Sequence, residues 1–149
     1  MQAGYDNGAD YFYQINDDVK MKTPNWESTF TSQLQTTKGF GVTGPTDESN
    51  TRILTQTFTH RTHLQIFDQY FPDPFRNWWS DDWLSEVYSG CTFRSHGIMV
   101  QHQTSNVGQR YPVHEAAGAL RTEVMRGQEK IRAWLKVSGR TSDAARCFA

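Results

Sequence analysis

The stretch that most constrains the fold is an aromatic-rich apolar run at residues 11–15, which leads directly into the triplet Asn16-Asp17-Asp18. A short apolar run bounded by polar turn residues is typical of a buried β-strand. A strand that buries both faces needs a neighbour on each side. We therefore expect this strand to lie inside a sheet, with the acidic triplet at the sheet's edge.

Strand and helix patterns alternate along the rest of the chain. Apolar residues recur at helical spacing in residues 23–39, 59–71, 80–90 and 117–135, and extended segments are expected at residues 40–43, 53–58 and 92–102. Alternation of this kind favours an α/β fold, with a mixed sheet flanked by helices. A length of 149 residues corresponds to one domain, for which we predict residues 1–137, with residues 138–149 as a disordered or frayed tail.

Composition narrows the possible functions. A formal net charge of −1 argues against a general nucleic-acid binder, which needs a basic face to neutralise phosphates. No apolar run approaches the roughly 18 residues of a transmembrane segment. Cys91 and Cys147 match no metal or redox spacing, and the sequence leaves open whether they pair or stay reduced.

The triplet Asn16-Asp17-Asp18 is the first candidate site. Ligands in α/β proteins collect at the ends of strands, and carboxylate and amide oxygens suit Mg²⁺ or Mn²⁺ shared with a diphosphate. The alternative is a turn that these side chains stabilise by hydrogen bonds to the backbone.

A second acidic cluster, Asp81-Asp82, is surrounded by Trp78, Trp79 and Trp83. Acidic residues in a first helical turn complement the helix dipole, which gives a structural explanation. A carboxylate against aromatic surface also has a raised pKa, which makes it a better base, and tryptophan faces stack on sugar rings. Both interpretations stay open.

Histidine and arginine residues supply the remaining candidates. His60 and His63 have the spacing of a zinc pair, but nothing nearby completes a zinc site, so packing and capping roles are favoured. His102 follows an extended segment, where it either completes a metal site or ends a strand. Arg110 either reaches a phosphate group or forms a surface ion pair.

Taken in order, these motifs resemble the GT-A glycosyltransferases. The run "YFYQINDDV" looks like the metal-binding motif of that family, and "NWWSDDW" looks like its acidic motif with tryptophan, with a histidine further along the chain. The resemblance spans roughly residues 5 to 136. It implies a partial, Rossmann-like GT-A domain that lacks the N-terminal nucleotide-binding βα units, because only ten residues precede the first strand.

The resemblance implies metal and donor roles at the acidic turn. Asp18 would bind Mn²⁺ or Mg²⁺ directly, and His102 corresponds to a second ligand near the C-terminus. Asn16 stands where the family usually has its first acid, and it would contact the metal or the ribose through its amide. Asp17 would contact the donor through its sugar or through water.

The resemblance also implies an acceptor side. Asp82 corresponds to the catalytic base, with Asp81 as the alternative. Trp79 and Trp83 would shape the acceptor site, and the loop at Gly44 would border it. A positioned base favours single displacement, so we expect inversion at the anomeric carbon.

The expected function is therefore metal-dependent transfer of a sugar from a nucleoside-diphosphate donor to a carbohydrate or glycoprotein acceptor. In a eukaryote, the resemblance would imply the secretory membrane system. Two alternatives remain. One is a non-catalytic carbohydrate- or protein-binding relic of the same fold, and the other is a metal-dependent hydrolase or phosphotransferase on a different α/β fold.

Overall fold

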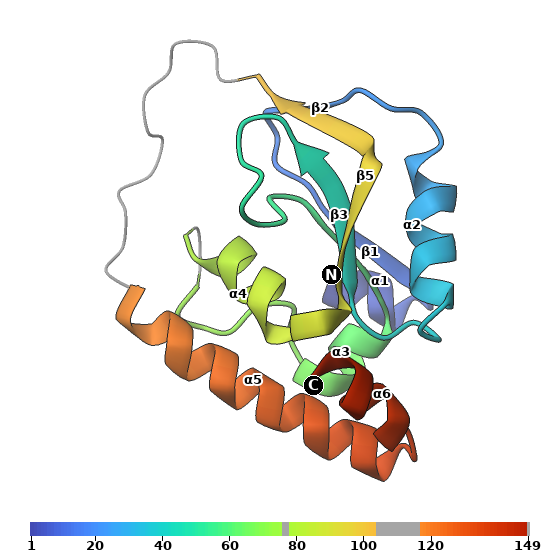
Figure 1. The fold of residues 1–149 in the computed structure, drawn as a ribbon, viewed down its shortest axis with the longest axis vertical. Coiled ribbons are helices and arrows are strands. Elements are labelled where there is room, and N and C mark those ends of the chain that lie inside the picture. The colour runs from blue at the N-terminus through green and yellow to red at the C-terminus, as the bar shows by residue number, and fades with distance from the viewer. Residues whose placement is uncertain (76–77, 104–116, 149) are drawn as a thin grey trace.

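The computed structural model describes residues 1–75, 78–103 and 117–148. One mixed sheet has the strand order β1-β4-β3-β5-β2 (Figure 1). Its strands are β1 (Tyr11–Gln14), β2 (Val19–Met21), β3 (Val42–Asp47), β4 (Thr57–His60) and β5 (Thr92–His102). β3 and β5 run parallel, and the other neighbouring pairs are antiparallel. The predicted α/β fold with a mixed, helix-flanked sheet is confirmed.

The helices pack on both faces of this sheet (Figure 1). They are α1 (Gln2–Asp6), α2 (Trp26–Gln35), α3 (Thr62–Phe67), α4 (Ser80–Val87), the 3₁₀ turn η1 (Ser89–Cys91), α5 (Ala117–Val137) and α6 (Thr141–Cys147). Phe30 and Leu34 of α2 pack with Phe58 and Ile98 on one face. The larger core, on the other face, is built from α3, α4, α5 and β3. Within the described ranges, no helix is long and apolar enough to cross a membrane.

Several elements differ from expectation. β1 lies at an edge of the sheet rather than inside it, and Phe12 is its one fully buried residue. β3 does not turn at Gly44 but continues to Asp47. The expected strand at 53–58 begins only at Thr57. β2 was not predicted, because three residues are too few to show a periodic pattern.

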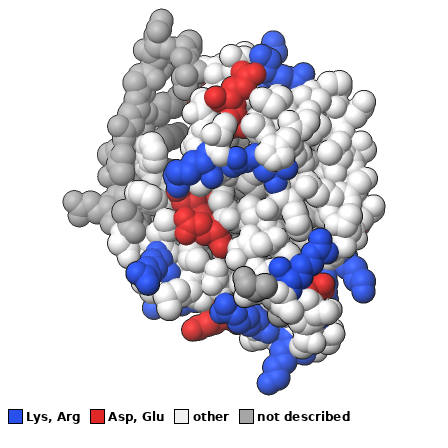
Figure 2. Space-filling model, viewed as in Figure 1, with Lys and Arg blue, Asp and Glu red and all other residues white. Residues whose placement is uncertain are grey.

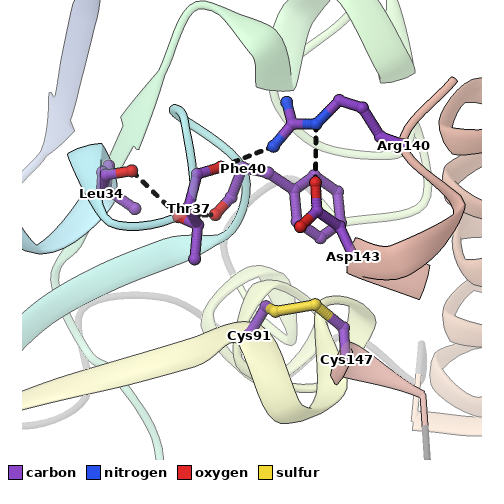
Figure 3. The surroundings of a disulfide bond; sticks show 7 residues. All are labelled: Leu34, Thr37, Phe40, Cys91, Arg140, Asp143 and Cys147. Atoms are coloured by element: carbon purple, nitrogen blue, oxygen red, sulfur yellow. Dashed lines mark hydrogen bonds and ion pairs between the residues drawn. A yellow bond between two sulfur atoms is a disulfide. The ribbon is translucent and has the colours of Figure 1, made fainter. Parts of the chain in front are cut away.

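The C-terminal residues also differ from the expected frayed tail, because they form α6 and join the core. Cys147 is buried and forms a disulfide with Cys91, the last residue of η1 (Figure 3). Arg140 adds a second attachment: its guanidinium donates to the Thr37 carbonyl oxygen and, at 2.8 Å, to Asp143. The disulfide and these hydrogen bonds hold a segment whose sequence has no apolar periodicity.

The register of the sheet brings one terminus of each of the five strands to the same end of the sheet. Gln14, the last residue of β1, pairs with Thr57, the first residue of β4. Asp47, the last residue of β3, pairs with Val100, and His102 at the end of β5 pairs with Val19 at the start of β2. The turn that joins β1 to β2 therefore crosses the ends of the three strands between them.

Candidate functional site

The Asn16-Asp17-Asp18 turn crosses the end of the sheet where the strands terminate, and hydrogen bonds fix it on both sides. The Asn16 amide donates to Gln56 Oε1 at 2.7 Å, and Gln14 donates to the Asn16 side chain at 3.0 Å. At the other end, the Gln103 amide donates to the Asp18 carbonyl oxygen. Asp17 between them is exposed. The turn therefore lies in a defined position over the ends of β4, β3 and β5.

Asp18 and His102, two predicted metal ligands, lie beside one another. Asp18 Oδ1 is 3.4 Å from His102 Nδ1. The opposite ring nitrogen, His102 Nε2, is 2.9 Å from Asp47 Oδ2. The imidazole thus lies between two carboxylates. The sequence analysis did not single out Asp47, because only the parallel pairing of β3 with β5 brings it to His102.

Asp47 is buried and held by several donors. Its Oδ1 accepts hydrogen bonds from the Ser49 amide at 2.8 Å and the Ser49 hydroxyl at 2.6 Å, and its Oδ2 accepts one from Thr55 at 2.6 Å. Burial acts to raise the pKa of Asp47. The hydrogen bonds from Ser49 and Thr55, together with the charge of His102, outweigh burial, and the net effect is a lowered pKa. A carboxylate of this kind stays ionised.

The acidic pair of α4 lies in the first turn of that helix, after Trp79, whose φ of 73° turns the chain into the helix. Asp82 is mostly buried and accepts a hydrogen bond from Arg52 at 2.6 Å. Asp81 is half-buried, and burial together with the adjacent charge of Asp82 raises its pKa to about 7. The two carboxylates therefore have different environments: Asp82 has a cationic partner, and Asp81 exchanges its proton near neutral pH.

One short segment, residues 52–56, contacts all three acidic regions. Arg52 pairs with Asp82, Thr55 donates to Asp47, and Gln56 accepts from Asn16. Five extended residues span at most about 17 Å, so these regions surround a common area. On the face that Figure 2 draws, a band of Lys and Arg side chains lies between two groups of Asp and Glu side chains. The sequence had indicated neither Arg52 nor Gln56.

Two predicted acceptor residues have structural roles instead. Trp83 is 1% exposed, packs in the larger core, and donates its indole N–H to the Glu123 carbonyl oxygen at 3.1 Å. Burial leaves almost none of the indole accessible to a sugar, and its N–H is already used, so Trp83 has a clear structural role. Gly44 lies inside β3, where a Cβ atom would come within 2.2 Å of the Gln56 carbonyl oxygen. Its lack of a side chain allows this close backbone approach, and it forms no loop beside an acceptor.

The remaining candidates are placed as follows. Trp79 is partly buried against the larger core. His63 is buried, and its ring nitrogens contact the Tyr88 hydroxyl and the Tyr70 carbonyl oxygen, each at 2.9 Å, as the packing interpretation predicted. His60 contacts the Thr62 hydroxyl at 2.7 Å. Arg110 lies outside the described residues.

The Asp18–His102 pair fits a divalent ion that shares its ligands with a substrate. A separation of 3.4 Å exceeds an ordinary N–H···O hydrogen bond and is close to the roughly 3 Å between adjacent ligands of an octahedral ion. In the described part of the chain, no three His, Cys, Asp or Glu residues are grouped so that they could hold a metal. Mg²⁺ sites that use one or two protein ligands complete the shell with phosphate and water.

An unsatisfied donor belongs to the residue that holds the start of the acidic turn. Gln56 is fully buried, and its Nε2 has no hydrogen-bond partner among the described residues, although its Oε1 holds the Asn16 amide. A buried amide nitrogen without an acceptor is costly, so it marks a place where a polar ligand or water is expected.

Comparisons with known proteins add no identification: no protein-family model, no curated protein and no solved structure matches the chain.

Proposed function

We propose that this chain carries the metal and acceptor side of a glycosyltransferase that resembles the GT-A type. The observation that carries the proposal is the contact between Asp18 and His102, at 3.4 Å. The family resemblance assigns both residues to one metal site, although most of the chain separates them in sequence. The position of Asp82, linked through residues 52–56 to the same area, supports the assignment of the acidic helix to the same site.

The metal would be held by Asp18 and His102, with Asn16 and Asp17 on the same turn close to the donor. When bound, Mn²⁺ or Mg²⁺ offsets the negative charge that develops on a departing nucleoside diphosphate. Among the described residues, Gln56 Nε2 and Arg52 are two donors of this region that anionic oxygens could use. Arg52 is suited to this task because its side chain is 66% exposed even while it pairs with Asp82.

The acidic pair supplies the base. The acceptor hydroxyl loses its proton to a carboxylate of α4 as its oxygen forms a bond to the anomeric carbon, and the bond from that carbon to the diphosphate oxygen breaks on the opposite face. Asp82 is the base that the resemblance assigns. Asp81 is the alternative, and its pKa of about 7 suits proton uptake at neutral pH.

Calorimetric titration of the chain with uridine and guanosine diphosphate sugars, with and without Mn²⁺, tests the proposal. We expect donor binding that depends on Mn²⁺ and that Asp18→Asn abolishes. The matched control is Asp73→Asn, which removes an exposed carboxylate and should leave binding unchanged. Donor binding that does not depend on Mn²⁺, or that Asp18→Asn leaves unchanged, would refute the proposal.

A second measurement separates catalysis from binding. Release of free nucleoside diphosphate in the presence of sugar acceptors should be lost in Asp82→Asn, while donor binding is retained. Loss of donor binding in this variant would place Asp82 in the metal site instead. Donor binding by the wild type without any release would favour the non-catalytic carbohydrate-binding alternative.

A further inference from the structure

Asp47 and Asp18 contact opposite nitrogens of the same imidazole. Asp18 Oδ1 lies 3.4 Å from His102 Nδ1, and Asp47 Oδ2 lies 2.9 Å from His102 Nε2. The two carboxylates differ in exposure: the side chain of Asp18 is 22% exposed, and that of Asp47 is 1% exposed. A ligand that arrives from solvent therefore reaches the Nδ1 side of the ring, and protein encloses the Nε2 side.

The acceptor capacity of Asp47 is already used. An ionised carboxylate has about four lone-pair sites. Three receive hydrogen bonds: two on Oδ1 from Ser49 and one on Oδ2 from Thr55, at distances between 2.6 and 2.8 Å. The contact with His102 Nε2 occupies the fourth. A metal bound directly to Asp47 would have to displace one of these groups from a closed environment.

The backbone fixes this contact as well. Asp47 is the last residue of β3 and pairs with Val100 of β5, two residues before His102. The Glu48 amide continues the pairing by donating to the Val100 carbonyl oxygen at 3.2 Å. His102 itself pairs with Val19 of β2, next to Asp18. The pairing of β3, β5 and β2 thus holds the imidazole of His102 between the carboxylates of Asp47 and Asp18.

We propose that Asp47 is a positioning residue for the metal site: it holds the N–H of His102 at Nε2, so that Nδ1 presents its lone pair to a divalent ion beside Asp18. This inference rests on the proposed function, since it needs Asp18 and His102 to bind the metal. A neutral imidazole has one donor and one acceptor nitrogen, and a fixed acceptor at one side determines which nitrogen is free to ligate. Outer carboxylates that orient metal-binding histidines act in this way.

Binding of Mn²⁺ alone, followed by calorimetry and by electron paramagnetic resonance, tests the inference. Asp47→Asn should bind Mn²⁺ about 10- to 100-fold more weakly than the wild type. The signal of an imidazole nitrogen coupled to Mn²⁺, seen by electron spin-echo modulation, should be weakened or lost. A purely structural role for Asp47 would change thermal stability but leave this nitrogen signal and the affinity of the folded protein unaltered.

Two further variants sharpen the experiment. Glu48→Gln is the matched control, because it removes one negative charge from the adjacent, exposed residue, which pairs with Lys22 at 3.7 Å. Its Mn²⁺ affinity should stay within about twofold of the wild type, since exposed charges are screened. Thr55→Val removes one hydrogen bond to Asp47 without a change in charge, and should weaken Mn²⁺ binding about three- to tenfold. If Asp47→Asn does not fold, the Mn²⁺ affinity of Thr55→Val tests the positioning role of Asp47 instead.

The outcomes separate the inference from the proposed function. If the wild type does not bind Mn²⁺, or if His102→Ala binds it equally well, the proposed metal site is refuted. If His102→Ala weakens binding while Asp47→Asn and Thr55→Val bind like the wild type, the inference alone is overturned. If Asp47→Asn abolishes binding as completely as Asp18→Asn does, Asp47 is itself a ligand, and the positioning role is also overturned.

Discussion

The raised pKa of Asp81 predicts that replacing this acidic residue stabilises the protein, and that the gain grows with pH. Asp81 lies half-buried in the first turn of α4, where burial and the adjacent charge of Asp82 raise its pKa from 3.8 to about 7. Each pKa unit corresponds to about 1.4 kcal/mol, so about three units give a limit of about 4 kcal/mol. Asp81→Asn removes the charge and keeps the shape of the side chain.

The sign follows from proton binding. Between about pH 4 and pH 7, the folded protein keeps the Asp81 proton that the unfolded chain has already lost, so the wild type loses stability as the pH rises through this window. Below it, Asp81 is protonated in both states and behaves like asparagine. The stability advantage of Asp81→Asn should therefore increase from well under 1 kcal/mol at pH 4 to as much as about 4 kcal/mol at pH 8.

Urea unfolding, followed by tryptophan fluorescence at pH 4 and pH 8, measures this difference directly. The control variant, Asp73→Asn, removes an exposed carboxylate and should change the free energy of unfolding by less than about 0.5 kcal/mol at both pH values. If Asp81→Asn gains the same stability at both pH values, or none at pH 8, then Asp81 is not the desolvated carboxylate that the structure describes. Its suitability as a base at neutral pH would then lose its support.

Two further predictions concern packing and covalent structure. Reduction of the Cys91–Cys147 disulfide, or replacement of both cysteines by serine, should lower the free energy of unfolding by about 4 kcal/mol. The reason is that the disulfide closes a loop over a sequence separation of 56 residues, which restricts the unfolded chain. Equal unfolding midpoints with and without reductant would contradict this prediction. Gly127→Ala should destabilise the protein by about 1–3 kcal/mol, although alanine has the better helix propensity. The cause is steric, because the alanine Cβ would lie 2.5 Å from Val87 Cγ2. A raised melting temperature would contradict the prediction and show that α4 and α5 can move apart.

Local patterns in the sequence located most of the helices. In α5, three of the apolar residues that recur at helical spacing are buried, as predicted: Val124, Ile131 and Leu135. In α2, Phe30 and Leu34 are fully buried on one side, as their four-residue spacing predicts. Amphipathic periodicity is a property of neighbouring residues, so it can be read without knowledge of the rest of the fold.

Trp83 shows where local reasoning fails. Its position beside two acidic residues is what a sugar-binding tryptophan would show, and also what a core tryptophan in the first turns of a helix would show. The difference is the Glu123 carbonyl oxygen of α5, which receives the indole N–H. That partner lies 40 residues away in sequence, and no pattern in the residues around Trp83 predicts the contact.

What the sequence determined by itself was an apolar strand followed by an acidic turn, a set of amphipathic helices, and an α/β class. The tertiary structure alone decided which side chains meet at the strand ends. Asp47 became the partner of His102, and Arg52 the partner of Asp82, through strand register and a connecting segment. The physical reason is that hydrophobic periodicity depends on a few consecutive residues, whereas strand order and register depend on contacts between segments that are distant in the chain.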